Sequence, residues 1–157
     1  MAQRATGRCT CGACRYALTA QPLIVHACHC SWCQRETGTA FALNGWIEAK
    51  HVVLESGETV DQTLPSESGT GQVVSRCADC QVVLWSVYGS GPVFRFVRLG
   101  TLDDPGLFPP DVHIFTSTKL PWVQLPDDVP AFPEFYRRSE VWRPESLERR
   151  KAALAEG

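Results

Sequence analysis

The fold is decided around the stretch Cys28-His29-Cys30-Ser31-Trp32-Cys33-Gln34-Arg35-Glu36-Thr37-Gly38. A short helix is expected to begin at Ser31, because Gln34 three residues later completes a capping-box pattern. Gly38 is a natural end for this helix, since glycine readily adopts the left-handed backbone conformation with which many helices close. The sequence therefore predicts an extended segment that runs directly into a short helix.

The three cysteines of this stretch are expected to converge. Cys28 and Cys30 share one side of an extended segment, and Cys33 follows in the first helical turn. The helix N-terminus favours negative charge and so lowers thiol pKa values. Three protein ligands with one open position are typical of a catalytic zinc ion. The alternative is a closed structural site in which Cys14 or His26 supplies the fourth ligand.

His29 is expected on the opposite side from these thiols. We consider two roles for it: support or proton transfer beside the metal site, or an ordinary hydrogen-bonded histidine on the reverse face.

The other cysteines lie in Cys9-Thr10-Cys11-Gly12-Ala13-Cys14 and in Cys77-Ala78-Asp79-Cys80. In an extended segment Cys9 and Cys11 project to the same side, and Cys77 and Cys80 form a C-x-x-C half-site. Together they predict a four-thiolate structural zinc site that joins the N-terminus to the middle of the chain. Cys14 is out of register with the pair and is interpreted as a buried small apolar residue. A redox dithiol at the C-x-x-C pair is disfavoured, because no thioredoxin-like strand and helix flank it.

The composition is that of one globular domain over residues 1–157. The chain has 157 residues, 44% of them hydrophobic, and a formal charge of -2, which gives no net positive field for nonspecific nucleic-acid binding. It contains no apolar run long enough for a membrane helix and no visible export signal. Eight cysteines in such a chain favour metal binding in a reducing, cytoplasmic setting over disulfides.

A mainly β fold of short antiparallel strands is expected, because most apolar runs are rich in β-branched and aromatic residues and end at turn residues. A second helix is expected from about Pro144 to Ala155, with acidic residues early and basic residues later, as the helix dipole favours. The predicted strands are Cys14–Ala20, Phe41–Ile47, Val52–Glu55, Val82–Tyr88 and Val93–Leu99.

Several of these segments, taken in order, resemble the glutathione-dependent formaldehyde-activating enzyme family, whose domain is shared with centromere protein V. The resemblance covers residues 7–122 and leaves an extension over 123–157. It implies a small β-tent-like fold pinned by zinc, with a structural ion on the outer four cysteines and a catalytic ion on Cys28, Cys30 and Cys33. It rests on Gly7–Tyr16, Cys28–Phe41, Cys77–Cys80, His113–Thr116 and Lys119–Trp122.

The resemblance implies a carbon–sulfur lyase with two zinc ions, which acts on a small thiol such as glutathione and an aldehyde such as formaldehyde. The alternatives are a noncatalytic zinc-binding interaction module and a redox or metal-storage protein. Trp32, Arg35 and Lys119 are candidate substrate contacts, although surface cations are the ordinary interpretation of the last two. His113 is more typical of a packed histidine than of a ligand, and the oligomeric state is left open.

Three positions depart from the family pattern. Cys14 replaces an apolar residue, and Trp32 stands where an acidic residue is common, beside the predicted open metal position. Gln81 replaces the glycine that usually follows the last cysteine, where a positive φ would suit glycine better.

Overall fold

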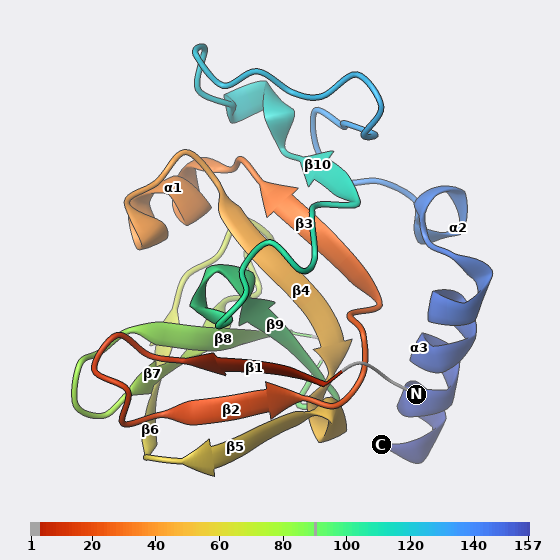
Figure 1. Cartoon of the computed structure of the whole chain (residues 1–157). Coiled ribbons are helices and arrows are strands. Elements are labelled where there is room, and N and C mark those ends of the chain that lie inside the picture. The colour runs from red at the N-terminus through yellow and green to blue at the C-terminus, as the bar shows by residue number, and fades with distance from the viewer. Residues whose placement is uncertain (1–3, 90) are drawn as a thin grey trace.

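A seven-stranded sheet forms the centre of the computed structural model, which describes residues 4–89 and 91–157 (Figure 1). Its strand order is β10-β3-β4-β9-β8-β7-β6, and a three-stranded sheet, β1-β2-β5, lies beside it. The mainly β fold predicted from the sequence is confirmed. The strands are β1 (Ala5–Arg8), β2 (Arg15–Leu18), β3 (Ile24–Cys28), β4 (Ala42–Glu48), β5 (Val52–Ser56), β6 (Thr59–Leu64), β7 (Gln72–Cys77), β8 (Val83–Tyr88), β9 (Phe94–Arg98) and β10 (Val112–Ile114).

All strand pairs of the described residues are antiparallel except one, in which β10 runs parallel to β3. A parallel pair needs a long crossover, and here most of the sheet is built before the chain returns to β3. β10 thereby brings Ile114 next to Cys28, at the end of β3 from which the central cysteine motif begins.

The helices are α1 (Ser31–Thr37), α2 (Arg138–Val141) and α3 (Pro144–Glu156), and η1 (Ala49–His51), η2 (Leu99–Thr101) and η3 (Thr116–Thr118) are single 3-10 turns. α1 ends as predicted, at Gly38 with a φ of 67°. The predicted capping box, with Ser31 as the N-cap, is wrong. The N-cap is Cys30, whose sulfur accepts a hydrogen bond from the Cys33 amide, while the Gln34 side chain donates to the carbonyls of His29 and Thr118.

Two apolar cores stabilise the molecule. One lies between the two sheets around Tyr16, Leu84 and Trp85. The other lies beside β3, β4 and β9, where Trp142 packs edge-on against Trp46 with ring centroids 5.0 Å apart. The C-terminal segment therefore completes the second core.

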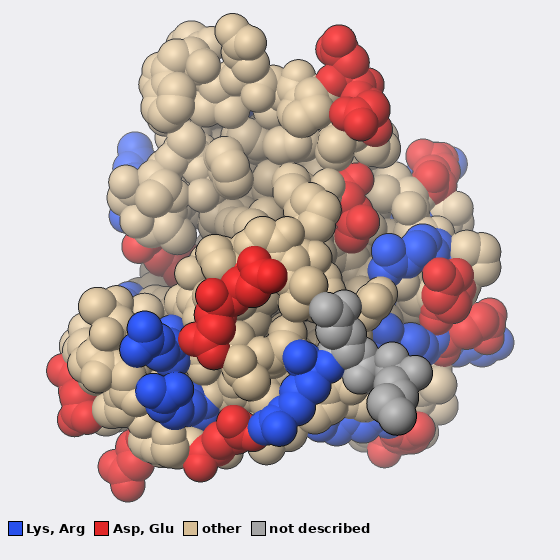
Figure 2. Space-filling view, viewed as in Figure 1, with Lys and Arg blue, Asp and Glu red and all other residues tan. Residues whose placement is uncertain are grey.

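An ion pair strengthens this attachment, because the Arg149 guanidinium binds both carboxylate oxygens of Glu48, at 3.0 and 2.6 Å. α3 is consequently held against the end of β4 (Figure 1). Within the described ranges, no helix is both long and apolar enough to cross a membrane. On the face shown in Figure 2, acidic and basic side chains are interspersed.

Candidate metal centre and its pocket

The outer four cysteines meet in space. The sulfur atoms of Cys9, Cys11, Cys77 and Cys80 all lie within 4.8 Å of one another. The Sγ–Sγ distance is 3.4 Å between Cys9 and Cys11 and 3.8 Å between Cys11 and Cys77. Tetrahedral zinc with Zn–S bonds of about 2.3 Å needs sulfur separations of about 3.8 Å. This quartet therefore fits a metal ion that joins the β1–β2 turn to the end of β7.

The local backbone explains how the two halves of the quartet form. Gly12 turns the chain with a φ of 79°, and the Cys14 amide donates to the Cys9 sulfur at 3.3 Å. On the other half, the Cys80 amide lowers the pKa of the Cys77 thiol, which favours the thiolate that a metal requires. Gln81 has a φ of 65°, so the position where the family usually has glycine is indeed left-handed.

Cys14 lies outside both metal-ligand groups. It is fully buried, and its thiol donates to the Glu58 carbonyl at 3.1 Å. The interpretation of Cys14 as a buried residue agrees with this position.

The central three cysteines form a second group. Cys28 ends β3, Cys30 caps α1 and Cys33 lies in its first turn; all three are buried, and their sulfurs lie within 4.8 Å of one another. Hydrogen bonds from the Cys28 and Cys33 thiols lower the pKa of the Cys30 thiol. Within the described residues, no fourth cysteine, histidine or carboxylate joins this group at that distance. This trio fits a metal ion with one position left for another ligand.

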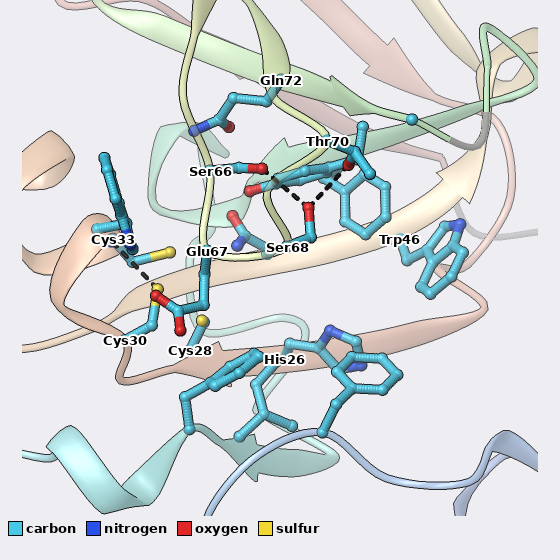
Figure 3. A pocket seen from close by; sticks show the side chains of 18 of the residues that line it. His26, Cys28, Cys30, Cys33, Trp46, Ser66, Glu67, Ser68, Thr70 and Gln72 are labelled. Carbon is cyan, nitrogen blue, oxygen red and sulfur yellow. Dashed lines mark hydrogen bonds between the residues drawn. The ribbon is translucent and has the colours of Figure 1, made fainter.

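His26, one of the two residues considered for closing the trio, is engaged elsewhere. Its Nε2 lies 2.5 Å from the Tyr136 hydroxyl, and burial lowers the pKa of the imidazole to about 3. The sulfurs of the trio instead face a cavity of about 590 Å³ (Figure 3). The cavity is lined by the trio and by His26, Trp32, Asn44, Trp46, Ser66, Glu67, Ser68, Thr70, Gln72, Tyr88, Gly89, Phe96, Ile114, Phe115, Phe135 and Arg138.

The other sequence-predicted residues divide into two sets. Trp32 lines the cavity, whereas Arg35, Lys119 and His29 do not. Arg35 is exposed, and the Lys119 ammonium donates to the carbonyls of Leu120 and Val123. His29 is fully buried, with its Nε2 2.9 Å from Nδ1 of His113. Arg35 is thus an exposed cation, Lys119 is partly buried against backbone carbonyls, and His29 is a hydrogen-bonded histidine outside the cavity lining.

Sequence reasoning missed much of the cavity wall. Glu67 belongs to the loop between β6 and β7, and Figure 3 shows its carboxylate directed toward the three sulfurs. Phe115 has a φ of 55°, a strained conformation of the kind often found at binding sites. Phe135 and Arg138 come from the C-terminal extension. The Ser66-Glu67-Ser68-Gly69 run is a turn signal that marks this loop, but nothing local predicts which cavity it covers.

The chain is β-rich and has two cysteine groups, a closed quartet and a trio that faces the cavity. Each group could hold a metal ion. A family model described as "Glutathione-dependent formaldehyde-activating enzyme" matches residues 4–118, and the chain belongs to this family.

A search among curated proteins gave no match. A crystal structure of a Rhodobacter sphaeroides protein is similar at 17% sequence identity and a TM-score of 0.45, over 81% of this chain and 99% of that one.

Proposed function

We propose that the protein is a zinc-dependent carbon–sulfur lyase, which joins a small thiol to formaldehyde and cleaves the adduct in the reverse direction. The single observation that carries this proposal is the trio of buried sulfurs that opens onto a cavity. Membership of the family supports the same activity, with glutathione as the thiol that the family description implies. Cys28, Cys30 and Cys33 would hold the catalytic ion, and Cys9, Cys11, Cys77 and Cys80 the structural one.

In the forward reaction the thiol sulfur bonds to the aldehyde carbon, and the thiol proton ends on the aldehyde oxygen. Bound zinc would supply a positive charge that lowers the pKa of a thiol next to it. We propose that Glu67 accepts the thiol proton and returns it to the oxygen of the adduct, because its carboxylate is directed toward the trio (Figure 3). The aromatic walls exclude water, and Trp32 at the rim contacts the substrate.

We propose that His29 acts on the far side of the trio rather than on substrate. It is buried beside His113, and the Thr118 hydroxyl and the Gln34 amide both donate to its carbonyl. These contacts fix the backbone between Cys28 and Cys30. Arg35 and Lys119 lie outside the cavity lining and would contact a substrate carboxylate only where the substrate extends beyond it.

We also propose that residues 1–157 act as one unit in the cytoplasm. The contacts of Trp142 with Trp46 and of Arg149 with Glu48 support the first statement. The second is supported by the eight cysteines, none of them in a disulfide in the described residues, a state that a reducing compartment preserves.

Stopped-flow measurement of adduct formation tests the activity. Wild type should exceed buffer, Cys30→Ser should fall to the buffer rate, and Cys14→Ala should keep the wild-type rate because it removes a buried thiol that belongs to neither sulfur group. Equal rates of adduct formation for wild type, Cys30→Ser and buffer would contradict the proposed lyase activity. Such a result with the metal retained would favour the noncatalytic zinc-binding module.

A further inference from the structure

The cavity beside the trio is mainly aromatic. Its polar wall is the β6–β7 loop, but the hydroxyls there bond one another: Ser66 to Ser68 at 2.9 Å and Ser68 to Thr70 at 2.8 Å (Figure 3). Two other lining residues, Gln72 and Trp46, each have a buried polar atom without a hydrogen-bond partner, Oε1 and Nε1. The aromatic lining consists of Trp32, Trp46, Tyr88, Phe96, Phe115 and Phe135.

The floor of the cavity is formed by paired positions of strands β3 and β4, so the cavity is elongated along these strands. Cys28 pairs with Ala42 at one end, His26 pairs with Asn44 in the middle, and Trp46 lies four residues beyond Ala42 on β4. At about 3.4 Å per residue, the two ends of this floor are about 14 Å apart. A ligand whose sulfur lies at the trio would reach Trp46 with its far end.

Arg138 lies at this far end. Its guanidinium is over the Trp46 ring, 5.4 Å from the centroid, and its Nε is buried without a hydrogen-bond partner. Within the part of the chain that the structure describes, no carboxylate forms an ion pair with it. The Nε of Arg150 is likewise buried and unpartnered.

The two guanidiniums are close enough to affect each other. The pKa of Arg150 is lowered by burial and by the charge of Arg138. Two like charges in a partly desolvated region favour an anion supplied from outside. Arg138 also lies beyond residue 118, where the family match ends, so this feature belongs to the extension.

We propose that the cavity takes an aromatic or otherwise apolar thiol that carries one anionic group about 10 Å or more from its sulfur, with the anion bound by Arg138. This inference rests on the proposed function and names its thiol. Glutathione fits these walls less well, because among lysine and arginine the described lining offers one side chain, Arg138, for its two carboxylates. Among lysine, arginine, aspartate and glutamate, the described lining contains Arg138 and Glu67.

Isothermal titration calorimetry with non-thiol probes tests the site separately from turnover. We expect 3-phenylpropanoate to bind wild type at least tenfold more tightly than 3-phenylpropanamide and more tightly than S-methylglutathione. Arg138→Gln should remove the preference for the acid, and Arg138→Lys should restore most of it. The matched control is Arg137→Gln, because the Arg137 side chain is 85% exposed and is not among the cavity-lining residues.

Equal affinity of wild type for acid and amide would overturn the proposal, and so would tighter binding of S-methylglutathione. This comparison needs no variant, so it stands even if Arg138→Gln does not fold. Cys30→Ser should keep probe binding while losing turnover. If the probe binds and wild type shows no turnover, the lyase proposal is wrong and the anion site is supported. If wild type turns over and the probe does not bind, the anion site is wrong and the lyase proposal is supported.

Discussion

The guanidinium of Arg98 on β9 lies 2.6 Å from the carboxylate of Glu36 on α1, with both side chains about nine-tenths buried. Arg98 also donates to the Asn44 side chain at 2.5 Å, and Gln72 donates to Glu36 at 2.7 Å. The network fastens the helix that carries Cys33 to three strands of the large sheet. The position of one sulfur of the trio therefore depends on a buried ion pair.

Glu36→Gln should lower the free energy of unfolding by about 3 kcal/mol, because it leaves the Arg98 charge buried without its partner. Denaturant titration measures the loss. The control is Glu140→Gln, whose partner is Arg137; these side chains are 59% and 85% exposed, so the change should stay below about 1 kcal/mol. Similar losses in both variants would contradict a special role for the buried pair.

Gly7→Ala should destabilise the packing between β1 and β2. A Cβ at Gly7 would lie 2.5 Å from the ring of Tyr16, which is fully buried and whose hydroxyl is fixed by Thr101 at 2.7 Å. We expect a loss of about 1–3 kcal/mol in thermal unfolding, typical of an overpacked core.

Gly100→Ala is the control for this change. Apart from its neighbours in the chain, no atom lies within 4 Å of the added methyl group, so stability should change by less than about 0.5 kcal/mol. A loss as large as that of Gly7→Ala would show that the clash is not the cause.

Gln81→Gly should stabilise the protein. The left-handed backbone at this position destabilises a residue that has a side chain by about 1–2 kcal/mol. Glycine avoids this strain but loses more conformational entropy on folding, which cancels about 0.5–1 kcal/mol of the gain. A small rise in the unfolding temperature is expected. Gln62→Gly, in strand β6, should lower it, and a fall in both would argue against relief of strain.

Metal removal should separate the two sulfur groups. We expect two zinc ions per chain by elemental analysis. Cys77→Ser should lose the fold, as seen by circular dichroism, because the quartet joins distant segments. Cys30→Ser should stay folded with one ion fewer, and unfolding of this variant would mean that the trio also supports the scaffold.

Much of the scaffold could be predicted from the sequence, because its signals are local. Five of the expected strands occur, as β2, β4, β5, β8 and β9, and the C-terminal helix begins at Pro144. The cysteine spacings also predict which sulfurs meet, since alternation in extended segments and one helical turn determine their directions.

The remaining elements depend on tertiary contacts. Strand β6 is polar and largely exposed, and it is held by pairing with β7 rather than by an apolar pattern of its own. Strand β10 has only three residues and forms because β3 offers a free edge. The far wall of the cavity comes from Phe135 and Arg138, more than 100 residues after the trio in sequence, so no local pattern could place it there.

The two sulfur groups differ in how much of the chain must be synthesised before all their cysteines are present. The trio is complete within six consecutive positions, from Cys28 to Cys33, although the ion pair that holds its helix needs Arg98, 62 residues after Glu36. In the quartet, Cys11 must wait for a partner 66 residues later. Closing that span costs conformational entropy of the chain, which only the contacts of the assembled sheets offset. During synthesis the three cysteines of the trio would therefore emerge together, whereas the quartet could close only after Cys80 has emerged.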